Sequence, residues 1–328
     1  MKSAWTRRGL FQWVAAAVAA GCAHNGRSSQ LPRAQTPLHD PNSFADVEAS
    51  VGGRVGVFAL DTGSGRRLAH REDERFAMCS TFKWALAAAI LARVDRGELR
   101  LEERVPYGQS DLLDYAPTTR EHIADGSMTI EGLAKAAIAN SDNTAANLLL
   151  TKVDGPSGLT LFFRRVGDSV TRLDRNEPTL NANIRGDVRD TTSPRAMVRL
   201  MQSVLCGDVL SPGSRDRLIG WLNACETGLE RLRAGLPAGW AVGDKTGTGP
   251  DGAVNDVAFV VPPRRAPILI ASYLSDSASS LPSLNAAHAE VGRIVAKYLV
   301  QSEVRTESPR RLAAGGRWPT KSLSESSA

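Results

Sequence analysis

The chain has 328 residues, of which 42% are hydrophobic and 23% charged, so its composition excludes a collagen, a coiled coil and a wholly disordered chain. The formal net charge is +5, but residues 23–300 carry 32 basic and 32 acidic side chains. A neutral body without a basic run argues against nucleic acid as the main partner.

Residues 1–22 have the composition of an export signal, with Lys2, Arg7 and Arg8 before a short apolar stretch. The Arg-Arg-Gly-Leu-Phe run resembles a twin-arginine signal. The Ala-Ala-Gly-Cys run that ends at Cys22 resembles a lipobox, in which this cysteine is lipidated and anchors the protein to a membrane. Cleavage by ordinary signal peptidase is the alternative. Either process leads to the periplasm or cell envelope.

The remaining chain is predicted to hold one folded domain over residues 42–300. A polar, proline-containing linker is expected at 23–41, and a disordered tail rich in Ser, Arg, Gly and Pro at 301–328. No other segment reaches about 18 apolar residues, the length needed to span a membrane.

The first part of the domain predicts a hairpin and then helices. Alternation over 54–60, a turn cluster at 61–65 and a return over 66–70 indicate paired strands. Helices are expected from Ser80 to about Gly97, over 129–152 with a break at 141–143, and over 156–165.

A long polar loop without periodicity follows at 172–192, and loops of this length are usually functional. Ser193 and Pro194 then predict the start of a helix that runs to about Cys206. The last elements in chain order are a helix over 212–224, strands over 240–247, 254–261 and 267–274, and a helix over 283–300.

These elements predict an α+β fold. The strands are too few and too grouped for a doubly wound parallel sheet. A mostly antiparallel sheet with flanking helices is expected to form an α/β lobe from about 42–73 and 212–300. The segment of about 74–211 is expected to form an all-α lobe.

Ser80 and Lys83 lie three residues apart at a predicted helix start and therefore share one face. The helix N-terminus favours a developing alkoxide, and a neighbouring lysine can activate a serine. Taken alone, the pair is more simply an N-cap serine with an exposed lysine.

Two further short motifs carry polar groups suited to a substrate. In Ser141-Asp142-Asn143, the hydroxyl can move a proton and the amide can bind a substrate, although such a cluster is commonly a turn. On a predicted strand, Lys245, Thr246 and Thr248 can bind a carboxylate, and Gly247 lets a substrate approach the backbone. The alternative is a solvated edge strand.

The fourth motif lies in the long loop. Glu177, with the amide of Asn181 nearby, can hold and activate a water. The Glu177–Pro178 bond is a candidate cis peptide, and Arg175 can close the loop by pairing with Asp190. A plain surface turn is the alternative.

The four motifs in this order resemble the class A serine β-lactamases. The resemblance covers roughly residues 42–300 and includes the stretches SDNTAANLLL, RDTTSP and LPAGW. It implies an enzyme that hydrolyses the amide bond of β-lactam antibiotics, penicillins and cephalosporins, through a serine acyl-enzyme, and so confers resistance. A monomer is expected, and no metal or cofactor is implied.

The resemblance also implies a role for each position. Ser80 attacks the lactam carbonyl, Lys83 or Glu177 takes its proton, and Ser141 passes a proton to the leaving nitrogen. Glu177 and Asn181 position the water that releases the product. The remaining implied residues bind substrate: Asn143, Lys245, Thr246, Thr248, Arg231 and Tyr115.

The chain differs from the carbapenem-hydrolysing members of the family at one position. Cys79 precedes the nucleophile as in carbapenem-hydrolysing members, but the position of its disulfide partner is Gly249, so carbapenem hydrolysis is not supported. Pairing of Cys206 with Cys225 stays open.

Two other functions are compatible with part of this motif set. A penicillin-binding DD-peptidase shares three of the four motifs, and a binding or sensor domain on the same fold would be acylated without release. Glu177 discriminates, because a water-activating position has no obvious use in a long-lived acyl complex.

Overall fold

The computed structural model describes residues 41–299. The expected signal at 1–22 with Cys22, the linker apart from its last residue, and the tail at 301–328 lie outside the described residues. None of the helices within 41–299 combines the length and apolar character needed to cross a membrane.

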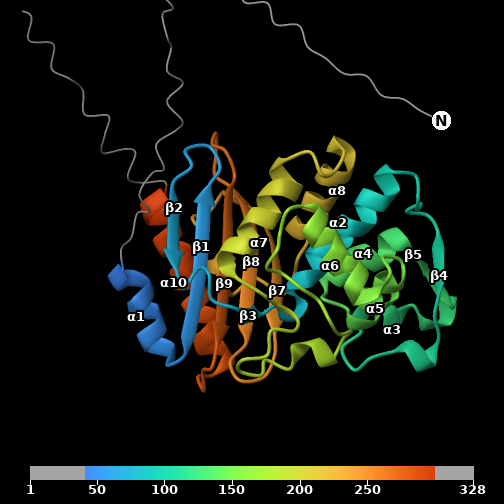
Figure 1. The fold of residues 1–328 in the computed structure, drawn as a ribbon, viewed down its shortest axis with the longest axis horizontal. Helices are drawn as coiled ribbons and strands as arrows, with labels where there is room; N and C mark the ends of the chain where they lie inside the picture. The colour runs from blue at the N-terminus through green and yellow to red at the C-terminus, as the bar shows by residue number, and fades with distance from the viewer. Residues whose placement is uncertain (1–40, 300–328) are drawn as a thin grey trace, which may run out of the picture. The chain divides into compact units, whose positions relative to one another are not determined.

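Five antiparallel strands form the main sheet, in the order β2–β1–β9–β8–β7 (Figure 1). β1 (Arg54–Asp61) and β2 (Arg67–His70) come from the start of the described chain. β7 (Ala241–Thr248), β8 (Val254–Val261) and β9 (Ile268–Ser275) come from its end. Pairing of β1 with β9 joins the two groups, so the prediction of one antiparallel sheet is confirmed.

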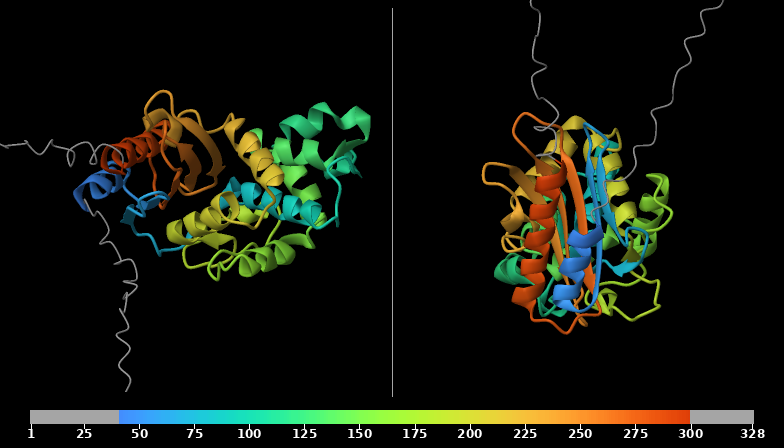
Figure 2. Two further views of the ribbon diagram at one scale, coloured as in Figure 1. Left: turned by 90° about the horizontal axis from the view of Figure 1, so that it is seen from above. Right: turned by 90° about the vertical axis from the view of Figure 1, so that its left-hand side faces the viewer.

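The central strands send alternate side chains into two separate cores, as the period of two requires. Ala59 and its cross-strand partner Ile270 enter one core, which α1 (Pro41–Val51) and α10 (Leu281–Leu299) cover. Phe58 enters the other core. Figure 2 shows α1 and α10 side by side on their face of the sheet. Because both faces are covered, β9 is buried along its whole length.

The second core joins the sheet to the helices. α7 (Pro194–Met201) contacts β1 and β9, and its N-cap Ser193 accepts a hydrogen bond from the Ala196 amide, as the sequence predicts. α2 (Phe82–Asp95) is apolar all round and almost wholly buried, which is the usual place for such a helix. The helices around α2 are α4 (Ile130–Ala139), α5 (Asn143–Thr151), α6 (Gly155–Arg165) and α8 (Pro212–Asn223).

Several elements differ from the prediction or were not predicted. The helix expected from Ser80 starts as a 3-10 turn at Cys79–Thr81, and the helix expected to reach Cys206 becomes a π-helix at Gln202–Cys206. The sequence pattern does not predict α1. Two short helices, α3 (Pro117–Glu121) and α9 (Leu232–Gly235), are also outside the prediction. The segment 74–211 is not all-α as expected, because it contains two short strand pairs: β3 (Phe76–Ala77) with β6 (Thr191–Thr192), and β4 (Arg104–Pro106) with β5 (Ser127–Thr129).

Candidate active site

A cavity of about 310 Å³ collects side chains from all four predicted motifs. They come from the turn before α2, the start of α5, the long loop and β7. The lining residues are Ser80, Tyr115, Ser141, Asn143, Asn181, Thr227, Arg231, Thr246, Gly247 and Thr248. Three further predicted residues, Lys83, Glu177 and Lys245, are buried and bond to residues of this lining.

Ser80 occupies the 3-10 turn between β3 and α2. The preceding Cys79 has φ of 45°, in the left-handed region that residues other than glycine rarely adopt. Strain of this kind concentrates at functional sites. The Ser80 hydroxyl donates a hydrogen bond of 3.1 Å to Oε1 of Glu177, so its proton already has an acceptor.

Gly247 lies against this turn, and its small size has a structural reason. A Cβ added there would lie 2.7 Å from the carbonyl oxygen of Met78 and 3.2 Å from the backbone nitrogen of Ser80. The sequence reading gave substrate approach as the reason for this glycine. In the structure, the β7 backbone itself approaches the turn that carries Ser80.

Lys83 is buried beneath the cavity and contacts three groups. Its Nζ lies 3.0 Å from Oε1 of Glu177 and donates to the carbonyl oxygen of Ser141 at 2.8 Å and to Oδ1 of Asn143 at 2.5 Å. Burial lowers the pKa of Lys83, and the attraction of Glu177 opposes that shift. The Ser80 hydroxyl and the Lys83 amine therefore meet at one carboxylate oxygen, an arrangement in which a proton can pass between the three groups.

Two asparagines hold Glu177 in place. Nδ2 of Asn181 donates to Oε2 of Glu177 at 2.6 Å. Asn147 donates to the Glu177 carbonyl at 2.9 Å and accepts from the Glu177 amide at 3.0 Å. The sequence reading missed Asn147, although its position four residues after Asn143 puts both on one face of α5. The Glu177–Pro178 peptide is cis, as proposed.

The loop that carries Glu177 is closed at its base. Nε of Arg175 lies 2.5 Å from Oδ2 of Asp190, and the Asp190 side chain is fully buried. Oδ1 of Asp190 accepts from the backbone amides of Asp174 at 2.7 Å and Arg175 at 2.9 Å. One carboxylate therefore joins the two ends of the loop.

Lys245 extends from the middle of β7 toward the Ser141 hydroxyl. Its Nζ donates to Oγ of Ser141 at 3.0 Å and to the carbonyl of Thr246 at 2.8 Å. The side chain is fully buried, and burial lowers its pKa to about 8. At neutral pH, Lys245 therefore still places a positive charge beside the cavity.

A second cation lies at the same end of the cavity. Arg231 is buried and donates to Oγ1 of Thr248 and to the carbonyl of Gly247, both at 2.8 Å. Buried cations beside hydroxyl groups bind carboxylates well, because charge-assisted hydrogen bonds are the strong ones.

The rim of the cavity holds one predicted residue and one that was missed. Tyr115 lines the cavity with 52% of its surface exposed. Thr227 was not predicted, and its hydroxyl lies 2.5 Å from that of Thr246. No local pattern marks Thr227, because only folding brings its loop to β7.

Cys79, Cys206 and Cys225 are free thiols, so the pairing left open between Cys206 and Cys225 does not form. Gly249 lies beside the first of them. A Cβ added to this glycine would be 2.9 Å from Sγ of Cys79.

Comparisons with known proteins agree on one family. Residues 42–299 match the model described as the β-lactamase enzyme family. β-Lactamase L2 of Stenotrophomonas maltophilia is 45% identical over 295 residues, 88% of this chain and 97% of that protein. The carbapenem-hydrolysing β-lactamase KPC of Klebsiella oxytoca is 47% identical over 231 residues, 70% of this chain and 78% of that protein. The solved ancestral (GNCA) class A β-lactamase is 56% identical with a TM-score of 0.76, covering 77% of this chain and 97% of that one.

Proposed function

This chain belongs to the class A β-lactamases, serine enzymes that hydrolyse β-lactams and confer resistance to them, and we propose that Ser80 is its nucleophile. The observation that carries this assignment is the meeting of the Ser80 hydroxyl and the Lys83 amine at Oε1 of Glu177. A serine in contact with a buried carboxylate and a buried amine can lose its proton as it attacks.

In acylation, Oγ of Ser80 bonds to the lactam carbonyl carbon and its proton moves to Glu177. The C–N bond of the ring then breaks, and the Ser141 hydroxyl gives a proton to the leaving nitrogen. Glu177 must then lose its proton, and the Ser141 hydroxyl must regain one. We assign this transfer to Lys83, whose amine lies 3.0 Å from Oε1 of Glu177 and, through its bond to the Ser141 carbonyl oxygen, beside residue 141. We assign the oxyanion to the amides of Ser80 and Thr248, and removal of one such donor typically slows a reaction about 10²–10³-fold.

In deacylation, Glu177 takes a proton from a water whose oxygen attacks the acyl carbon. Asn181 and Asn147 fix the position of this carboxylate, which supports the assignment. The ester bond to Ser80 breaks, and the proton returns to its oxygen. This step makes turnover continuous and distinguishes the hydrolase from a penicillin-binding peptidase.

We assign the substrate carboxylate to the end of the cavity where Lys245 and Arg231 lie with the hydroxyls of Thr246 and Thr248. Asn143 then contacts the substrate's side-chain amide, and Tyr115 forms a wall of the entrance. The proposed substrates are penicillins and cephalosporins. KPC is named for carbapenem hydrolysis; in this chain Gly249 gives Cys79 no disulfide partner.

We further propose that the enzyme is an exported monomer, tethered to a membrane through a lipid on Cys22. The twin-arginine and lipobox resemblances of residues 1–22 support this, and class A β-lactamases are typically exported. Mass analysis of membrane-extracted protein tests the lipid, and a mature protein without a lipid-modified cysteine contradicts it.

The residue assignments are tested with a chromogenic cephalosporin, by reading absorbance and intact mass together. The wild type should turn over continuously and retain no adduct. Ser80→Ala should show neither turnover nor adduct. Glu177→Ala should accumulate an adduct, because Lys83 can still assist acylation whereas the water has lost its base.

A matched control is Glu121→Ala, which removes an exposed carboxylate of α3. It should behave like the wild type. Full activity in Ser80→Ala would overturn the nucleophile, and absence of an adduct in Glu177→Ala would overturn the role of Glu177 in deacylation.

A further inference from the structure

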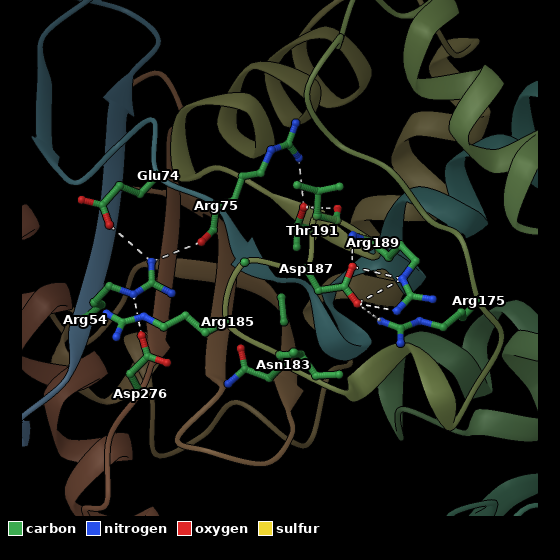
Figure 3. A pocket seen from close by; sticks show the side chains of 14 residues that line it. Arg54, Glu74, Arg75, Arg175, Asn183, Arg185, Asp187, Arg189, Thr191 and Asp276 are labelled. Atoms are coloured by element: carbon green, nitrogen blue, oxygen red, sulfur yellow. Dashed lines mark hydrogen bonds and ion pairs between the residues drawn. The ribbon is translucent and has the colours of Figure 1, made fainter.

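A second cavity, of about 300 Å³, shares no lining residue with the active site. We name it the loop pocket. One wall is residues 183–189 of the loop that carries Glu177, and the opposite wall is formed by Arg54 at the start of β1, Glu74 and Asp276 (Figure 3). The space corresponds to about ten water molecules.

The lining of the loop pocket contains more positive than negative side chains. The charged residues are five arginines (Arg54, Arg75, Arg175, Arg185 and Arg189) and three carboxylates (Glu74, Asp187 and Asp276). All three carboxylates are already engaged by arginines other than Arg185. Arg175 is also paired with the buried Asp190 behind the lining. The five arginines therefore face four carboxylates, and one positive charge remains in surplus.

Arg185 is an exposed arginine that has no partner in the lining. Within residues 41–299 its side chain makes no hydrogen bond or ion pair. Figure 3 shows it extended from the loop toward Arg54. A guanidinium group keeps its charge at every pH that proteins experience, so this charge persists.

Arg54 has one end of its guanidinium group available. Its Nε lies 2.7 Å from Oδ2 of Asp276, and its Nη1 donates to Oε2 of Glu74 and to the carbonyl of Arg75, each at 3.3 Å. Its Nη2 makes no hydrogen bond to the described residues. Arg54 is thus held in place by its neighbours while it still presents two N–H donors.

We propose that the loop pocket binds a small multivalent oxyanion, of the pyrophosphate type, between Arg54 and Arg185. Two planar guanidinium groups match the paired oxygens of such an anion. The bound anion would connect the loop at residue 185 to β1 at residue 54. This inference does not depend on the proposed catalytic roles.

The experiment is a calorimetric titration of the protein with pyrophosphate at constant ionic strength, because salt screens exposed charges. We expect saturable binding of one anion per chain. Arg185→Gln should weaken it at least about tenfold, since a charge-assisted contact is lost. Arg100→Gln, which changes an exposed arginine outside the pocket, should bind like the wild type.

A second variant separates the loop pocket from the active site, which also has cations. Arg231→Gln should leave the binding intact. If binding is lost in Arg231→Gln and kept in Arg185→Gln, the anion occupies the active site and the proposal is wrong. Absence of saturable binding to the wild type, or an equal loss in Arg100→Gln, also overturns it.

Amide hydrogen exchange tests the connection to the loop. Saturating pyrophosphate should slow the exchange of residues 183–189 in the wild type and leave it unchanged in Arg185→Gln. Binding without slower exchange would show that the anion does not connect the loop to β1.

Discussion

At the scale of single residues, burial changes the pKa of the two active-site lysines. Lys83 and Lys245 are both fully buried, and burial lowers the pKa of each because it penalises the charged form. Lys83 has the carboxylate of Glu177 at 3.0 Å to offset that penalty. Lys245 donates instead to a hydroxyl and a carbonyl, and its pKa is lowered to about 8.

The charge of Lys245 predicts an alkaline limit to activity. Its pKa is lowered to about 8, so the ammonium to which we assign the substrate carboxylate is lost as pH rises through about 8. We expect kcat/KM, which reports the free enzyme, to fall over that range. In Lys245→Arg the charge persists, and the alkaline limb should move to higher pH even if activity is lower.

The control for this pH profile is Lys135→Arg, which changes an exposed lysine of α4. It should keep the wild-type profile. If the alkaline limb stays in place in Lys245→Arg, a group other than Lys245 sets it.

At the scale of elements, the loop 172–192 depends on a few polar anchors. It contains one 3-10 turn and a two-residue strand, so backbone pairing contributes little to its shape. Asp190 joins the two ends of the loop, and Asn147 of α5 forms hydrogen bonds to the backbone of Glu177 in its middle. The position of Glu177 therefore depends on one carboxylate within the loop and on one asparagine outside it.

Asp190→Ala should destabilise the enzyme by about 3 kcal/mol, since it leaves Arg175 and two backbone amides without their acceptor. kcat should also fall under conditions in which the variant is fully folded, because Glu177 loses its fixed position. Denaturant unfolding and steady-state kinetics measure the two effects.

The matched comparison is Glu131→Ala, which breaks an exposed ion pair with Arg217. Such pairs contribute less than about 1 kcal/mol. A loss of stability in Asp190→Ala no larger than in Glu131→Ala would show that Asp190 does not anchor the loop.

At the scale of the whole molecule, His288 links α10 to the sheet. Its Nδ1 lies 2.9 Å from Oγ of Ser272 in β9, and its Nε2 lies 3.0 Å from the carbonyl of Val254 in β8. Because the carbonyl can only accept, Nε2 carries the proton and Nδ1 accepts from the serine. Burial lowers the pKa of His288 to about 3, so the folded protein holds it neutral.

This histidine predicts a loss of stability in acid. The unfolded chain gains a proton on His288 below its ordinary pKa of about 6.5, whereas the folded chain does so only near pH 3. His288 therefore does not reduce the free energy of unfolding above pH 6.5, and it reduces it progressively as pH falls from 6.5 toward 3. At pH 5 the free energy of unfolding is lower by about 2 kcal/mol than it is at neutral pH, as a result of this one histidine.

In His288→Gln the free energy of unfolding should change less between pH 7.5 and 5.0 than in the wild type, as measured by denaturant titration. His122→Gln changes an exposed histidine and should keep the wild-type pH dependence. An unchanged pH dependence in His288→Gln would mean that other groups govern acid unfolding.

The sequence by itself determined the main strands, the long helices and the identity of the motifs. β1 has the alternation and β9 the continuous apolar run that are typical of buried strands, and Ser193 with Pro194 marks a helix start. These features can be predicted because each depends only on residues that are neighbours in the sequence. β3 and β6 have two residues each, too few to show any period. The order of the four motifs was enough to indicate the family.

Only the tertiary structure decided which atoms meet. The hydrogen bond from Ser80 to Glu177 spans 97 positions, and the one from Lys245 to Ser141 spans 104. The tight approach of β7 at Gly247 and the loop pocket around Arg185 likewise appear only after folding. Contacts over such separations depend on how the two cores pack against the sheet, and no local pattern in the chain encodes that packing.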